Sequence, residues 1–232
     1  LAHNENEVTR LSNDVFTMDK ILLGDVFIRG GSSSGTHVLE EGRPIGQFYG
    51  LVCNGIDENG RYIMVDKDGD GEISDPADYD YIGSAQPKLT YGITNTFRYK
   101  NFDLSFFLRG TIGNDILNAT RMAYAQSGFL PGTNALDDPL TYTLSETPRF
   151  SNYYLEKGSF MRLDNLTLGY KIKALNGIRV YFTAQNLFVI TKYKGLDPEV
   201  PMDSGDGLTP GVEPREFYPK ARTFSVGLNL NF

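Results

Sequence analysis

The sequence predicts an all-β chain that forms a portion of an antiparallel transmembrane β-barrel with long extracellular loops. Three observations indicate this fold class: a final segment of alternating residues, two hairpins with short turns at the same end, and no apolar run near the ~20 residues of a membrane helix. Inside a bilayer only helices and closed barrels satisfy all their backbone groups. Any crossing of a membrane by this chain must therefore be made by strands.

The last eleven residues, 222–232, alternate without a slip. One face carries Phe224, Val226, Leu228, Leu230 and Phe232, and the other carries Thr223, Ser225, Gly227, Asn229 and Asn231. Barrel strands turn an apolar set to lipid and a polar set to the lumen. A soluble sandwich shows the same period, but few such domains end on an aromatic residue. We therefore expect the last strand of a bacterial outer-membrane barrel, with the C-terminus at the periplasmic rim.

Two hairpins precede that strand. Residues 89–99 and 102–108 alternate around a tight turn at Lys100 and Asn101, and residues 166–172 and 178–188 alternate around a turn containing Asn176 and Gly177. Met161 and Leu163 stand out of phase with the strand that follows, which predicts a β-bulge near Asp164 and Asn165. Strand parity places both short turns at the periplasmic end.

Two long polar segments, residues 111–158 and 192–219, then fall at the other end as extracellular loops. Before residue 55 the candidate strands are 26–29, 37–40 and 47–52, and the Gly/Ser-rich stretch 30–35 is interpreted as a flexible loop because no Gly-Lys-Ser/Thr follows it. About eight strands are too few for a wide pore. They indicate one arc of a larger barrel.

Composition argues against several other classes of protein. The net charge of −7 disfavours a nucleic-acid partner, and a single cysteine, Cys53, excludes an internal disulfide framework. His3 and His37 are isolated, so no zinc or triad pattern is present. The acidic pairs Asp137/Asp138 and Asp203/Asp206 lie in Gly- and Pro-rich segments typical of solvated turns. We therefore predict no enzymatic activity. Residues 1–10 carry no signal peptide pattern.

One acidic segment has the spacing of a calcium loop. Asp66, Asp68 and Asp70 occupy positions 1, 3 and 5, Gly71 the turn position 6, and Glu72 position 7. Position 12 is Ala77, so Asp78 becomes the candidate last ligand if the Asp75-Pro76 insertion bulges outward. The sequence predicts a structural calcium site at 66–78 with the ligands Asp66, Asp68, Asp70, Glu72 and Asp78. The alternative is a solvated acidic turn.

Several segments together resemble a known family. They are GRPIGQFYGLVCNGI at 42–56, the DKDGDGEI loop, IGSAQPKLTYGITNTFRYKNFDLSFFLRG at 82–110, FMRLDNLTLGY at 160–170, VYFTAQNLFVITKYKGLDPEV at 180–200 and the terminal YPKARTFSVGLNLNF. In order and spacing, residues 1–232 are similar to the C-terminal portion of a SusC/RagA-type TonB-dependent outer-membrane transporter. One departure is the extra residue before Asp78, since the family's acidic loop usually lacks it.

The resemblance implies a barrel of about 22 strands with an N-terminal plug, a TonB-contacting segment and a SusD-like surface lipoprotein partner. The whole assembly would import oligosaccharides or peptides through the outer membrane, and residues 1–232 would supply barrel wall, lipid contacts and extracellular loops. Two other functions fit the same residues: a secreted, soluble, calcium-dependent β-sandwich binding module, and a passive porin-like channel.

Overall fold

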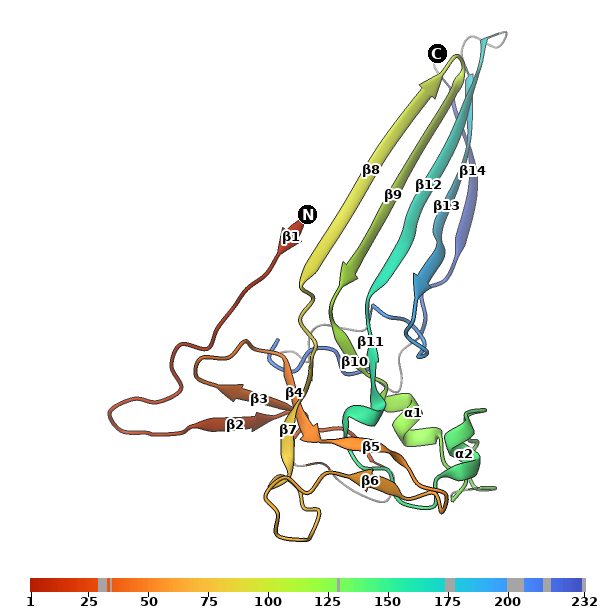
Figure 1. The fold of residues 1–232 in the computed structure, drawn as a ribbon. Coiled ribbons are helices and arrows are strands. Elements are labelled where there is room, and N and C mark those ends of the chain that lie inside the picture. The colour runs from red at the N-terminus through yellow and green to blue at the C-terminus, as the bar shows by residue number, and fades with distance from the viewer. Residues whose placement is uncertain are drawn as a thin grey trace.

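The computed structural model describes residues 1–28, 33, 35–128, 130–173, 178–199, 207–214 and 218–230. Long strands lie side by side at one end of the molecule, and short strands and helices gather at the other end (Figure 1). The elements are β1 (Ala2–His3), β2 (Lys20–Leu23), β3 (His37–Glu40), β4 (Gln47–Leu51), β5 (Cys53–Ile56), β6 (Tyr62–Met64), β7 (Tyr79–Ser84), β8 (Leu89–Tyr99), β9 (Phe102–Ile112), β10 (Asp115–Leu117), α1 (Ala119–Tyr124), α2 (Pro139–Thr143), η1 (Asn152–Tyr154), β11 (Leu155–Lys157), β12 (Phe160–Ile172), β13 (Ile178–Thr191) and β14 (Thr223–Asn229). None of the described helices is long and apolar enough to cross a membrane.

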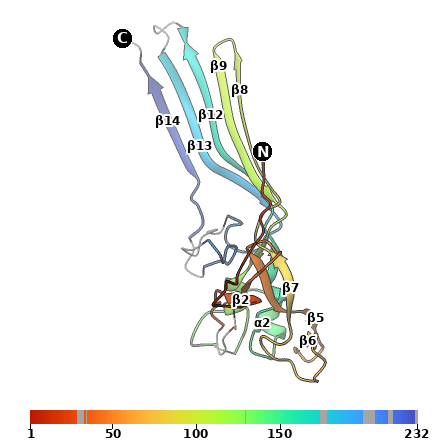
Figure 2. The same ribbon diagram turned by 90° about the vertical axis from the view of Figure 1, so that its left-hand side faces the viewer.

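The long strands form one antiparallel sheet in the order β1-β8-β9-β12-β13-β14. Figure 2 shows it as a curved, open wall. The sheet is not closed on itself within the described residues. An antiparallel wall of this kind confirms the predicted fold class.

The first predicted hairpin is confirmed. Tyr99 pairs with Phe102, so Lys100 and Asn101 alone make the turn, and Lys100 adopts a φ of 55°. The predicted bulge is confirmed too, because the register of β12 shifts between Leu163 and Asn165 against both of its neighbours. The turn at Asn176 and Gly177, the terminal Asn231 and Phe232, and the acidic pair Asp203/Asp206 lie outside the described residues.

The two faces of the wall differ as a barrel requires. Large apolar side chains stand exposed on one face, among them Ile93, Phe97, Phe102, Leu168, Phe182, Phe224, Val226 and Leu228. Exposed apolar rows of this extent are typical of a surface that water does not solvate, and here they match the predicted lipid face.

The opposite face, which we call the lumen face, carries an ion pair across the strand β12. Arg179 Nε donates to Asp103 Oδ1 at 2.9 Å and Arg179 Nη2 donates to Asp103 Oδ2 at 2.5 Å. Between them lies Gly169, where an added Cβ would stand 2.4 Å from Arg179 Nη2. The absence of a side chain at Gly169 therefore leaves room for the pair to join β9 to β13.

The other end of the molecule is a compact unit that we call the head, made by the described residues 20–28, 33, 35–85, 115–128 and 130–157. It contains the sheet β2-β3-β4-β7, the pairs β5-β6 and β10-β11, and α1, α2 and η1. Its core includes Phe48, Leu51, Leu117, Met122 and Phe150, each fully buried. The segment 111–158, predicted as a long polar loop, contains β10, α1, α2, η1 and β11, and its apolar residues contribute to this core. Of the early candidate strands, 37–40 and 47–52 correspond to β3 and β4. Residue 29 lies outside the described residues, and the described part of 26–29 holds a bridge position at Ile28 but no strand.

A candidate cation site and an arginine–carboxylate cluster

The acidic segment forms the loop between β6 and β7, at the end of the head farthest from the long sheet (Figure 1). Carboxylate oxygens of Asp66, Asp68 and Asp78 lie within 4.8 Å of one another. Three of the five predicted ligands therefore come together. Asp78, the residue placed last by the sequence argument, is one of them.

Backbone hydrogen bonds fix the geometry of this loop. Asp66 Oδ1 accepts from the N–H of Gly69 at 2.6 Å and Asp66 Oδ2 accepts from the N–H of Gly71 at 2.9 Å. Gly69 and Gly71 have φ values of 79° and 90°, which residues with a side chain rarely adopt. The glycines thus let the chain curl around the Asp66 carboxylate.

Asp78 is buried and ties both ends of the loop together. Its Oδ1 accepts from the N–H of Lys67 at 2.6 Å, and its Oδ2 accepts from the N–H of Ser74 at 2.8 Å. Hydrogen bonds from Ser74 and Lys67 hold the pKa of the Asp78 carboxyl below its usual range. Because the charged form is favoured in the folded loop, the ionised Asp78 carboxylate stabilises the fold at any pH above the ordinary aspartate pKa near 4. This stabilisation is lost as the pH falls through the lowered pKa.

The remaining acidic side chains of the segment are placed differently. Asp70 Oδ1 accepts from the N–H of Glu72 at 2.8 Å, and neither residue joins the group of three. Asp75 instead pairs with Arg149, whose Nη2 lies 2.7 Å from Asp75 Oδ1. The described loop therefore offers Asp66, Asp68 and Asp78 as carboxylate ligands, and the Asp70 carboxylate would need to turn inward to join them.

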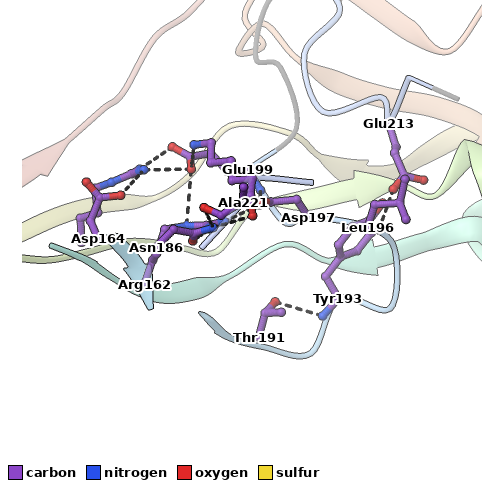
Figure 3. Close-up of polar contacts among 12 residues, drawn as sticks. Arg162, Asp164, Asn186, Thr191, Tyr193, Leu196, Asp197, Glu199, Glu213 and Ala221 are labelled. Atoms are coloured by element: carbon purple, nitrogen blue, oxygen red, sulfur yellow. Dashed lines mark hydrogen bonds and ion pairs between the residues drawn. The ribbon is translucent and has the colours of Figure 1, made fainter. Parts of the chain in front are cut away.

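A second cluster of charges lies where the long sheet meets the head. No motif in the sequence predicts this cluster. Arg109 of β9 and Arg162 of β12 are direct partners in the register. Facing like charges destabilise a sheet unless opposite charges intervene. Here the carboxylates of Asp164, Asp197 and Glu199 surround the two guanidinium groups (Figure 3).

Arg162 is the centre of this cluster, with a side chain only 1% exposed. Its Nη2 donates to Asp197 Oδ1 at 2.5 Å, its Nη1 donates to Asn186 Oδ1, and its Nε lies 3.6 Å from Glu199 Oε2. Asn186 takes a φ of 50° in β13, beside the bulge in β12. Both irregular strand positions therefore lie next to the buried arginine, and one of them, Asn186, accepts its hydrogen bond.

Glu199 pairs with the other two cations of the cluster, which are Arg109 and Lys220. It accepts from Arg109 and from Lys220, and three carboxylates in total face three cations. Burial acts to raise the pKa of the Glu199 carboxyl, but the hydrogen bonds from Arg109 and Lys220 outweigh it and leave the pKa below the usual range. Glu199 is therefore ionised at neutral pH.

The available signals for this cluster were two arginines at lumen positions of neighbouring strands and the acidic GLDPE run that follows β13. Neither signal specifies a partner, because Arg109 and Glu199 are 90 residues apart in the chain.

Comparison with known proteins finds relatives of one kind, the TonB-dependent receptors. No family model matches the chain. It is 35% identical over 251 residues to the TonB-dependent receptor SusC of Bacteroides thetaiotaomicron, with 100% of this chain and 24% of that protein covered. It is 34% identical over 237 residues to the TonB-dependent receptor P3 of Formosa agariphila, with 85% of this chain and 23% of that protein covered.

Among solved structures, the chain is similar to the RagAB peptide transporter. The TM-score is 0.72 at 25% identity, over 97% of this chain and 26% of the other. The chain spans about a quarter of the length of these relatives. By sequence and by fold, this chain belongs to the SusC/RagA-type TonB-dependent transporters, of which it represents a portion of the barrel.

Proposed function

We propose that this chain supplies barrel wall and outer loops to an energy-coupled importer in the bacterial outer membrane. The observation that carries the proposal is the antiparallel wall with an exposed apolar face and a polar, ion-paired face. Such a wall is suited to lipid on one side and water on the other. Import would depend on TonB and on a SusD-like surface lipoprotein, and the C-terminus would lie at the periplasmic rim.

The proposed cargo is an oligosaccharide, as the resemblance to SusC-type sequences implies. A peptide is the second candidate, because the structurally similar RagAB is described as a peptide transporter. Recognition of the cargo would then belong to the complete assembly, at the outer end of the barrel.

Uptake by cells tests this proposal. We expect cells that express the full-length protein with its lipoprotein to accumulate labelled oligosaccharides, and cells that lack TonB to lose that accumulation. Accumulation that persists without TonB would instead indicate a passive channel. Uptake of labelled peptides alone would replace the oligosaccharide assignment and leave the importer itself intact.

We further propose that the loop 66–78 binds calcium. The grouped carboxylates of Asp66, Asp68 and Asp78 fit a hard cation that prefers oxygen ligands, and the Asp70 carboxylate and the Glu72 backbone carbonyl are the candidates to complete the shell. The cation would offset repulsion among carboxylates that the fold holds close together. Its role would be to stiffen the loop, so it takes no part in moving cargo.

Calcium titration of the full-length protein in detergent tests this site. We expect Asp66→Asn to weaken binding at least tenfold, because its carboxylate is both a ligand and the centre of the loop. Asp14→Asn is the matched control, since that exposed carboxylate lies in a different loop. Equal binding by the wild type and the Asp66 variant would favour the solvated acidic turn.

A further inference from the structure

The segment that follows β13 runs from the barrel wall to the head. We call its described parts, residues 192–199 and 207–214, the strap. It belongs to the segment 192–219, which strand parity predicts to be an extracellular loop. In the structure both of its described parts make specific contacts with other segments of the chain.

At one end the strap binds the lumen face of the wall. Asp197 pairs with the buried Arg162, and Glu199 pairs with Arg109 and Lys220 (Figure 3). The backbone N–H of Glu199 also donates to Asp197 Oδ1 at 2.9 Å, so the two acidic residues are held in one orientation. These contacts reach strands β9 and β12, which are far from the strap in the chain.

At the other end the strap pairs with the head. Leu117 and Val212 form a parallel bridge, with the N–H of Leu117 donating to Gly211 O at 2.9 Å and the N–H of Glu213 donating to Leu117 O at 3.0 Å. The buried Glu213 carboxylate accepts from the N–H of Leu196 at 2.9 Å. His37 Nε2 donates to Pro210 O at 2.9 Å.

Burial decides whether such a segment can open during use. Exposed ion pairs separate at little cost because water replaces the partner. The pair of Arg162 with Asp197 is not exposed in this way, because the Arg162 side chain is 1% exposed and the Asp197 side chain is 5% exposed. Separating the strap from the wall would break the contacts of Arg162 with both Asp197 and Glu199, and that of Arg109 with Glu199, in a single step.

We propose that the strap is a permanent brace that joins the head to the barrel wall throughout the transport cycle, and that it is not a lid that opens for cargo. This inference rests on the proposed importer function. Whatever movement admits cargo would then occur elsewhere, and head and wall would move as one body.

A reversible disulfide between the strap and the head tests whether the strap is a permanent brace. Leu117→Cys and Val212→Cys, introduced into the full-length protein together with Cys53→Ala, place two thiols at the parallel bridge between strap and head. We expect uptake in the oxidised form to stay within twofold of uptake by the same protein after reduction. The reduced form is the matched control for folding and assembly, and mass spectrometry reports the fraction cross-linked.

A tenfold loss of uptake on oxidation that recovers on reduction would overturn the proposal and identify the strap as a gate. If neither form imports any oligosaccharide or peptide while the wild type also fails, the importer function is at fault. The strap is then judged by hydrogen exchange of the wild-type protein in detergent. Protection of residues 192–199 comparable to that of β12 supports the brace, and exchange as fast as in an exposed loop refutes it.

Discussion

Arg162→Met is expected to lower the free energy of unfolding of the full-length protein by about 3–5 kcal/mol. The variant removes the cation that pairs with the buried Asp197, and it leaves Asn186 Oδ1 without the guanidinium that donates to it. A buried carboxylate that has lost its partner is costly because neither water nor another charge stabilises it. Denaturant-induced unfolding in lipid vesicles measures the change.

Lys220→Met is the matched control for that variant. Lys220 also pairs with a carboxylate of the cluster, but its side chain is 42% exposed, so we expect a loss of only about 0–1 kcal/mol. Combining Arg162→Met with Asp197→Leu should recover most of the stability, because a buried ion pair can often be replaced by packed apolar groups. Equal losses for Arg162→Met and Lys220→Met would contradict the central place of Arg162.

Val226→Arg is expected to destabilise the barrel by about 2–4 kcal/mol, whereas Ser225→Arg should have little effect. Val226 is 75% exposed on the apolar face of β14, and Ser225 lies next to it on the lumen face. An arginine on the lipid face must lose its hydration, but one on the lumen face keeps it. Folding into lipid vesicles at a series of urea concentrations compares the two variants. Similar losses of stability in the Val226→Arg and Ser225→Arg variants would show that the two faces of β14 meet the same solvent.

The barrel strands could be predicted from the sequence because their signals are local. Alternation with a period of two gives the faces of β8, β9 and β14, and Lys100 with Asn101 gives one turn. Even the bulge at Asp164 leaves a local trace, since the apolar phase slips there. Local patterns of this kind need no knowledge of distant partners.

The head could not be predicted in the same way. Its strands β5 and β6 have only four and three residues, too few to show a period. Its core brings together residues as distant as Phe48, Leu117 and Phe150, and nothing in the local sequence specifies that meeting. Long polar segments were therefore interpreted as loops, although scattered apolar residues within them build a core.

The two candidate sites also differ in whether a local sequence pattern predicts them. The acidic loop is contiguous, so its spacing anticipated the grouping of Asp66, Asp68 and Asp78, while the identity of the cation stays a prediction. The arginine cluster depends on Asp197, which is 35 residues from Arg162 in the chain. Charge partners set by tertiary structure leave no spacing rule in the sequence.

The intact mass of the native protein, extracted from outer membranes in detergent, distinguishes a barrel segment from a secreted module. We expect residues 1–232 to be recovered as part of a much larger polypeptide that needs detergent to stay in solution. A native protein of 25.9 kDa that remains soluble without detergent would contradict this expectation, and would favour the secreted calcium-dependent binding module.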